Sequence, residues 1–210
     1  MAQQGVYASG DLTFFSNFDS GNLAGVERKP GNWVISIQFE LWVGADASHL
    51  GHSAYRVWFF FGIRGLTKGA NVRFTVMNFS GMKNLFGNRY KIVWTTQPSK
   101  DLWLKLPFEI NYEALPGNNA RVTWDFEAQE SAVHYFAFAY PYTLEKLDRV
   151  LREVQASAPT TAYFHRETLI YTPQNRPVEL ISITDSANVR PEAEDTLPHL
   201  FPSDTPRAAR

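Results

Sequence analysis

Cysteine is absent from this chain of 210 residues. The sequence therefore allows no disulfide framework, no thiolate zinc site and no cysteine nucleophile, and it suits a reducing compartment. Long apolar runs are missing too, since no stretch approaches the ~18 residues that a membrane helix needs. The opening MAQQGVYASGDL has no charged region followed by an apolar one, so it does not resemble a signal peptide. We expect a cytoplasmic protein with no membrane partner.

An excess of charge of one sign is also lacking. The formal net charge is -1, with 20% charged, 44% hydrophobic and 15% aromatic residues. Such a chain offers no general attraction to phosphate backbones, and we predict no nucleic-acid partner. The composition is that of a globular protein, and the length allows one full domain plus part of another.

No helical pattern occurs before residue 142, whereas short strand patterns separated by turn signals are frequent. Ile35–Val43 alternates apolar and polar residues, and Val57–Ile63 is apolar throughout, as in a central strand covered on both sides. The turn TKGAN then predicts a hairpin between Val57–Ile63 and Val72–Phe79. Further predicted strands are Leu12–Phe18, Leu23–Arg28, Phe108–Tyr112, Arg121–Glu127 and Val133–Tyr140. The sequence predicts an antiparallel β-sandwich over residues 1–140.

After Pro141 the apolar period becomes helical. Thr143–Ala156 is predicted as an amphipathic helix, and Tyr163–Tyr171 and Val178–Thr184 as strands, followed by a proline-rich tail. One helix and two strands supply too little burial for a core of their own. We therefore expect residues 141–210 to be a separate, incomplete unit that packs on the sandwich or continues beyond Arg210.

Four segments carry a family resemblance: DLTFFSNFDSGNLAGVE, HSAYRVWFFFGIRGLTKGANVRFTVMNFSGMKNLF, VHYFAFAYPYTLEKLDRVL and TAYFHRETLIYTPQNRPVELISIT. In this order they resemble the N-terminal region of cytosolic carboxypeptidases, M14-type metallopeptidases that trim glutamate from tubulin and other proteins. The stretch HRETLIYTPQNRPVELISIT and the terminal LFPSDTPRAAR are most similar to the type-five branch, which also removes the branch-point glutamate.

This resemblance implies an antiparallel β-sandwich placed before an α/β carboxypeptidase domain, with Tyr140, Pro141 and Tyr142 as the interdomain joint. It implies zinc in the full-length parent, held through a His-x-x-Glu pair and a later histidine that lie downstream of these residues. We therefore assign no catalytic and no metal-binding residue here. The implied partners are the protein's own catalytic domain and tubulin or another polyglutamylated protein. The implied location is the cytoplasm, with microtubule association as an extension.

A small basic patch is the one surface feature that invites a functional hypothesis. KNLFGNRYK carries Lys83, Arg89 and Lys91, and Arg73 lies upstream. If this loop faces the substrate entrance, it could attract glutamate-rich tails, mainly by raising the encounter rate. A solvated loop is the simpler interpretation.

Other candidate groups have simple structural interpretations. His49 and His52 with Asp46 lack a third ligand at a usable spacing, and His134, His165 and His199 lack partners. Asp125 and Glu127 share the polar side of a strand whose other side carries Trp124. Six tryptophans on a sandwich could form a sugar-binding platform, although core packing is favoured. The alternative function is thus a stand-alone β-sandwich module that binds carbohydrate or protein.

Overall fold

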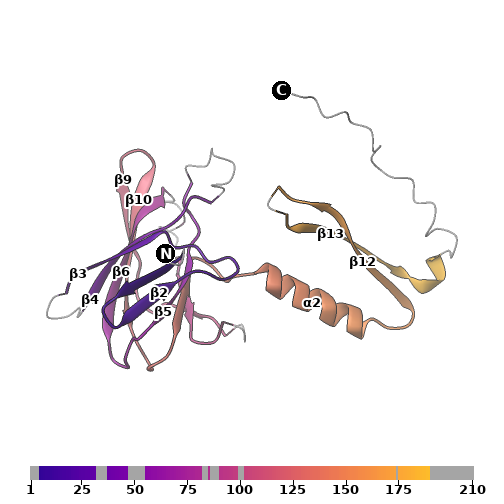
Figure 1. Cartoon of the computed structure of the whole chain (residues 1–210), viewed down its shortest axis with the longest axis horizontal. Helices are drawn as coiled ribbons and strands as arrows, with labels where there is room; N and C mark the ends of the chain where they lie inside the picture. Colours follow the sequence, from indigo (N-terminus) through magenta and orange to yellow (C-terminus); the bar gives the residue numbers. More distant parts are fainter. Residues whose placement is uncertain are drawn as a thin grey trace. The chain divides into compact units, whose positions relative to one another are not determined.

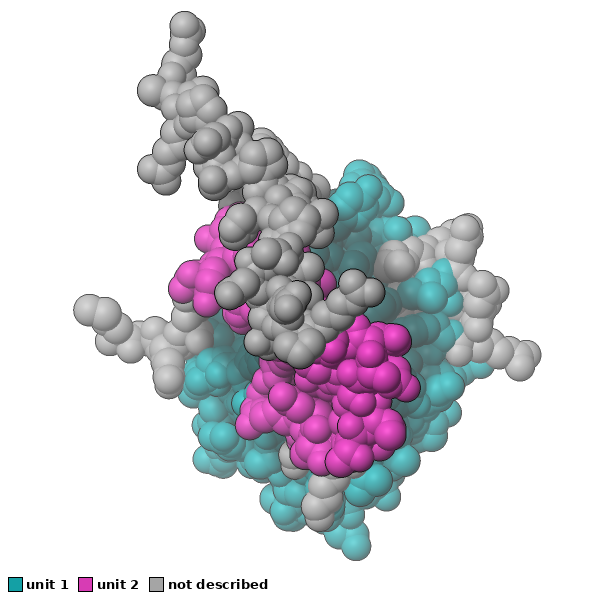
Figure 2. All heavy atoms as spheres, turned by 90° about the vertical axis from the view of Figure 1, so that its right-hand side faces the viewer, with its two compact units in different colours: residues 1–145 teal, residues 146–210 magenta. Residues whose placement is uncertain are grey.

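The computed structural model describes residues 5–31, 37–46, 55–81, 85, 90–98, 102–173 and 175–189. The chain divides into two compact units, residues 1–145 (unit 1) and 146–210 (unit 2), which are coloured separately in Figure 2. The predicted boundary at Pro141 lies slightly before this division. Among the described residues, no helix is long and apolar enough to cross a membrane.

Unit 1 is built from two β-sheets (Figure 1). The six-stranded sheet has the order β1-β2-β5-β11-β7-β8, with bounds β1 Val6–Ser9, β2 Leu12–Phe15, β5 Phe60–Arg64, β11 His134–Ala137, β7 Val93–Thr95 and β8 Leu104–Lys105. The five-stranded sheet has the order β3-β4-β6-β10-β9, with bounds β3 Gly25–Pro30, β4 Ile37–Trp42, β6 Asn71–Ser80, β10 Asn119–Glu127 and β9 Asn111–Leu115. The predicted mainly-β sandwich class is confirmed.

The predicted hairpin between Val57–Ile63 and Val72–Phe79 is wrong. β5 lies in the six-stranded sheet and β6 in the five-stranded sheet, so the chain crosses from one layer to the other between them. Both strands have apolar sides, and these are buried by facing one another, as the ring contact of Phe61 with Phe74 at 6.1 Å shows. The crossing also brings β6 beside β4 in parallel, whereas the other strand pairs are antiparallel.

The space between the sheets is filled mainly by aromatic rings. Phe14 contacts Phe39 at 4.7 Å, and Trp124 stacks on Phe59 at 5.5 Å with an interplanar angle of 7°. Each buried large apolar side chain contributes about 1.5–3 kcal/mol. Alternation places Val122, Trp124 and Phe126 inward from β10, as the sequence predicted.

The sequence patterns missed three strands, β1, β7 and β8. Each has at most four residues, which is too short for a period of two to be recognised. β5 lies third from one edge of its sheet, and both of its sides are covered, as the unbroken apolar pattern indicated.

Unit 2 contains most of helix α2 (Leu144–Ser157) and the antiparallel hairpin β12 (Ala162–Tyr171) and β13 (Pro177–Asp185). The predicted helix and both strands are confirmed within one or two residues at most ends. No residue of α2 is buried, and most of the large apolar side chains of the hairpin are exposed, with Ile183 68% and Ile170 61% exposed. These elements thus have no closed core among the described residues, as expected from their number.

Candidate functional site

The outer face of the six-stranded sheet carries a second set of aromatic residues. Because side chains alternate along β5, Phe59 and Phe61 point between the sheets while Phe60 points outward. We define the outer aromatic cluster as the buried Phe60, Val93 and Ala137 with the partly buried Phe18, Trp58, Trp103 and Tyr135. A sheet face directed at water is normally polar, so this cluster is the feature of unit 1 that calls for a functional explanation.

Phe60 is the centre of the cluster. Its ring lies 4.6 Å from that of Phe18 and 5.5 Å from that of Trp103, in edge-on contacts. Beside it, Phe15 lies over Gly62, where an added Cβ would come within 2.3 Å of the Phe15 ring. The Arg64 guanidinium caps Phe15 at 4.3 Å from its centroid, a cation–π contact that leaves the charge at the rim.

A tight loop after β2 forms one rim of the cluster. Asn22 uses its side chain to bridge two segments: Nδ2 donates to the carbonyls of Trp58 (2.9 Å) and Gly44 (3.1 Å), and Oδ1 accepts from Gly44 N–H at 2.9 Å. The Trp58 indole N–H donates to the Ser20 carbonyl at 2.7 Å. A Cβ on Gly21 would lie 2.1 Å from the Ser16 carbonyl oxygen, so this loop needs glycine there.

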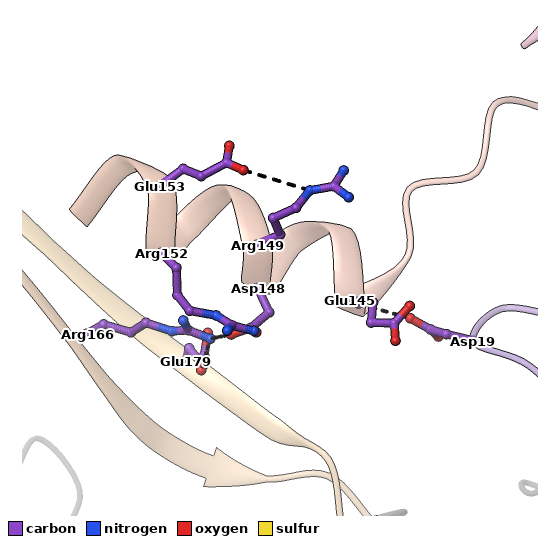
Figure 3. Close-up of polar contacts among 8 residues, drawn as sticks. All are labelled: Asp19, Glu145, Asp148, Arg149, Arg152, Glu153, Arg166 and Glu179. Carbon is purple, nitrogen blue, oxygen red and sulfur yellow. Dashed lines mark hydrogen bonds and ion pairs between the residues drawn. The ribbon is translucent and has the colours of Figure 1, made fainter. Parts of the chain in front are cut away.

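The chain leaves the sandwich beside this loop. β11, which carries Tyr135 and Ala137 of the cluster, leads to the predicted joint, where Pro141 is buried while Tyr140 and Tyr142 are exposed. At the end of unit 1, the Asp19 carboxylate accepts a hydrogen bond from the backbone N–H of Glu145 at 3.1 Å (Figure 3). A first-turn N–H of a helix has no partner within the helix, so Asp19 acts as a cap across a long sequence separation.

From the sequence, this loop is only a turn between the predicted strands Leu12–Phe18 and Leu23–Arg28. That interpretation missed Asp19 and Asn22, whose side chains bond backbone groups far along the chain. No local pattern shows this, because a turn-forming Asp or Asn has the same neighbours whether its side chain bonds locally or at a distance.

The outer face of the five-stranded sheet is different. Arg73 on β6 forms a bidentate ion pair with Asp125 on β10, with Nε–Oδ1 2.6 Å and Nη2–Oδ2 2.8 Å. The hydroxyls of Thr75 and Thr123 lie 3.1 Å apart on the next rung. Further along the sheet, Arg121 Nη1 donates to Glu113 Oε2 at 3.2 Å. At these positions, charged and hydroxyl groups pair with one another across neighbouring strands.

The two described members of the predicted basic patch lie in different parts of unit 1. Arg73 lies on the five-stranded sheet, where Asp125 neutralises its charge and raises its pKa. Lys91 precedes β7 of the other sheet, and its ammonium donates to the Phe108 carbonyl at 2.7 Å. Lys83 and Arg89 lie outside the described residues, so the steering hypothesis stays a prediction.

The remaining candidates of the sequence are accounted for as follows. Asp125 lies on the polar side of β10, as predicted, with Arg73 as its partner. The Asp46 carboxylate accepts from the N–H of Val57 at 2.9 Å, while His49, His52 and His199 lie outside the described residues. Trp124 is buried, as core packing predicts, and the other tryptophans described are partly buried; Trp33 lies outside the described residues.

His134 is fully buried, stacks on Trp94 with 6.1 Å between ring centroids, and meets Phe126 edge-on at 5.2 Å. Neither ring nitrogen reaches a partner at hydrogen-bonding distance and angle. Burial lowers the pKa of His134, against smaller raising effects of the Ala132 carbonyl and the Glu130 carboxylate. His165, by contrast, is about half exposed on β12.

Within unit 2, an ion-pair network joins α2 to the hairpin (Figure 3). Arg166 donates from Nη2 to Asp148 Oδ1 and from Nε to Glu179 Oε2, both at 2.7 Å. Asp148 also pairs with Arg152 one turn later. Arg166, followed by Arg152, lowers the pKa of the Asp148 carboxyl. The network aligns the helix with its hairpin but forms no reactive centre.

The described side chains include no cluster of metal ligands. Within the described part of the chain, no three His, Cys, Asp or Glu side chains lie close enough together to hold a metal ion. This part of the chain therefore does not fit a catalytic zinc, which needs three protein ligands.

Comparison with known proteins identifies the sandwich. A family model described as the cytosolic carboxypeptidase N-terminal domain matches residues 14–139. The chain belongs to the cytosolic carboxypeptidase family. Bovine (Bos taurus) cytosolic carboxypeptidase-like protein 5 is 28% identical over 233 residues, covering 96% of this chain and 26% of its own length. Mouse (Mus musculus) cytosolic carboxypeptidase 6 is 30% identical over 191 residues, covering 88% of this chain and 33% of its own.

Solved structures show the same fold. A putative carboxypeptidase from Burkholderia mallei aligns with a TM-score of 0.56 at 22% identity, over 81% of this chain and 38% of its own. A metallo-carboxypeptidase from Burkholderia cenocepacia aligns with a TM-score of 0.53 at 19% identity. This chain of the cytosolic carboxypeptidase family thus spans about a quarter to a third of the curated relatives it matches.

Proposed function

We propose that these residues are the non-catalytic N-terminal part of a zinc metallocarboxypeptidase that removes glutamates from polyglutamylated tubulin or another polyglutamylated protein. The match of the N-terminal domain model to residues 14–139 carries the proposal. The catalytic zinc, the substrate and a cytoplasmic, microtubule-associated location come from the family resemblance. In this proposal the sandwich supports folding of the catalytic domain and shapes its substrate entrance.

The state of unit 2 supports the proposal. Its helix has no buried residue, and both faces of its hairpin carry exposed apolar side chains such as Ile170 and Ile183. An isolated two-stranded hairpin is at best marginally stable in water. Such elements gain stability when further strands and helices cover them, which is what the first elements of an α/β domain would require.

The decisive experiment is to express the complete reading frame and compare it with the 210-residue chain. The longer polypeptide should contain about one zinc per chain, the ratio usual for a catalytic zinc site. It should release glutamate from tubulin tails, with separate substrates for branch-point and chain glutamates. The 210-residue chain should do neither. Stoichiometric zinc in the 210-residue chain would contradict the proposal, as would a longer polypeptide that binds zinc but releases no C-terminal glutamate.

Support of folding is tested by removing residues 1–140 from the longer polypeptide. We expect this deletion to yield aggregated or inactive protein. Full activity and an unchanged melting temperature after the deletion would eliminate the supporting role and leave the family assignment intact.

The steering role of the basic patch is a separate part of the proposal. Reversal of Lys83, Arg89 and Lys91 to glutamate in the longer polypeptide should lower kcat/KM for polyglutamate and weaken its dependence on salt. Arg73→Glu is a poor member of this set because Asp125 already neutralises Arg73. Unchanged kcat/KM and salt dependence would remove the steering role.

A further inference from the structure

The two outer faces of the sandwich differ in a way that sandwich stability alone does not require. On the five-stranded sheet, charged and hydroxyl side chains pair with one another, as Arg73 does with Asp125. On the six-stranded sheet, the outer aromatic cluster occupies the corresponding position, and Trp58, Trp103 and Tyr135 are only partly buried. Aromatic enrichment with few charges is the composition of the buried centre of an interface.

The cluster also lies where the chain exits. Phe18 belongs to the cluster, and the next residue, Asp19, bonds the N–H of Glu145 at the end of unit 1. Tyr135 and Ala137 of β11 connect to Tyr140 and Tyr142 through only a few residues. A polypeptide that continues from this point remains tethered close to the cluster, so its effective concentration there is high.

We propose that the outer aromatic cluster is the surface of this domain on which the carboxypeptidase domain of the longer polypeptide docks. This inference rests on the proposed function and adds the surface that the proposed supporting role uses. The chain covers only 26% of the length of bovine cytosolic carboxypeptidase-like protein 5, so its relatives carry a large additional part that needs a surface to pack on. Interfaces between domains of one chain commonly bury about 600–1,500 Å², which a sheet face of this kind can supply.

Trp103 and Trp42 provide a matched comparison. Both are partly buried tryptophans, Trp103 in the cluster and Trp42 at the end of β4 in the five-stranded sheet, where its ring lies against Gly25. Their oxidation by hydroxyl radicals can be measured residue by residue by mass spectrometry, without any substitution. A docked domain shields the first ring and leaves the second unchanged.

The test compares the hydroxyl-radical oxidation of each residue in the 210-residue chain and in the polypeptide from the complete reading frame. We expect oxidation of Phe18, Trp58, Trp103 and Tyr135 to fall several-fold in the longer polypeptide, with Trp42 unaffected. As a second measurement, Trp103→Ser should lower the melting temperature of the longer polypeptide more than that of the 210-residue chain, because only the longer one loses a docking contact. Trp42→Ser should lower both equally.

Several results would overturn the inference. Equal oxidation of the cluster in both polypeptides would reject it while leaving the proposed function intact. Protection of Trp42 in place of Trp103 would assign docking to the other face. Protection that appears in the 210-residue chain on raising its concentration would identify a second copy as the occupant. A reading frame that stops soon after Arg210 would reject the inference together with the proposed function.

Discussion

The outer faces of the two sheets differ in polarity, although both belong to the same sandwich. The outer face of the five-stranded sheet carries a bidentate ion pair and a hydroxyl pair. The outer face of the six-stranded sheet carries aromatic rings packed around Phe60. Both faces belong to strands with buried inner sides, so the inner side does not determine the outer one. The difference teaches that an unbroken apolar strand such as β5 indicates two buried sides without telling what covers the second.

Phe60→Ala should give the largest effect. The ring is nearly fully buried among Phe18, Trp58, Trp103 and Tyr135, so its removal leaves a cavity and should cost about 3–5 kcal/mol of unfolding free energy. Urea unfolding followed by tryptophan fluorescence reports unit 1 alone, because all six tryptophans precede residue 146. Gln38→Ala on the opposite face is the control, with a change within about 0.5 kcal/mol. Equal losses of unfolding free energy in the two variants would show that the two outer faces contribute equally to stability.

Two glycines provide a matched pair for the next effect. An alanine Cβ at Gly62 would lie 2.3 Å from the Phe15 ring, whereas at Gly25 it would meet Trp42 at an ordinary 3.4 Å. Gly62→Ala should therefore destabilise by about 1–3 kcal/mol through overpacking. Gly25→Ala should be neutral or slightly stabilising, since glycine is unfavourable inside a strand. The urea midpoints of both variants measure this, and the reverse order would show that the cluster tolerates repacking.

The buried His134 should make the stability of unit 1 depend on pH. The pKa of His134 is lowered in the folded protein below its ordinary value of ~6.5, so the unfolded chain binds more protons as pH falls. Stability is retained above that value and lost as the pH decreases toward the folded pKa. His134→Leu should flatten the dependence of the urea midpoint on pH between about 7.5 and 5.5. His165→Leu should leave it unchanged, because tryptophan fluorescence reports unit 1 and His165 lies in unit 2. If the urea midpoint of His134→Leu depends on pH as strongly as that of the original chain, groups other than His134 cause the dependence.

The smallest effect should come from the five-stranded face. A double-mutant cycle of Arg73→Ala and Asp125→Ala should give a coupling of about 1 kcal/mol or less, because both side chains are more than a third exposed and solvent screens the pair. The coupling should shrink further in 1 M salt, about the concentration at which the Debye length falls to ~3 Å. A coupling energy larger than the loss of unfolding free energy in Phe60→Ala would show that the polar face contributes more to stability than the aromatic face.

Much of the fold could be predicted from local sequence patterns. Val122, Trp124 and Phe126 alternate and are buried, and the stripe from Leu144 to Val154 marks a helix. Strand pairing was less accessible, since the turn TKGAN fits both a hairpin and a crossing between sheets. The functional surface was hardly accessible at all, because it combines Phe18, Trp58 and Trp103 from distant segments.

By itself, the sequence determined the strand and helix classes, the switch of period near Pro141 and, through resemblance, the family. These follow from periodicity and residue type, which are properties of neighbours along the chain. Only the tertiary structure decided that β5 and β6 face each other across the core, that Asp125 neutralises Arg73, and that rings from four segments meet on one outer face. Those outcomes depend on which surfaces become buried together, and burial is shared between residues that are far apart in sequence.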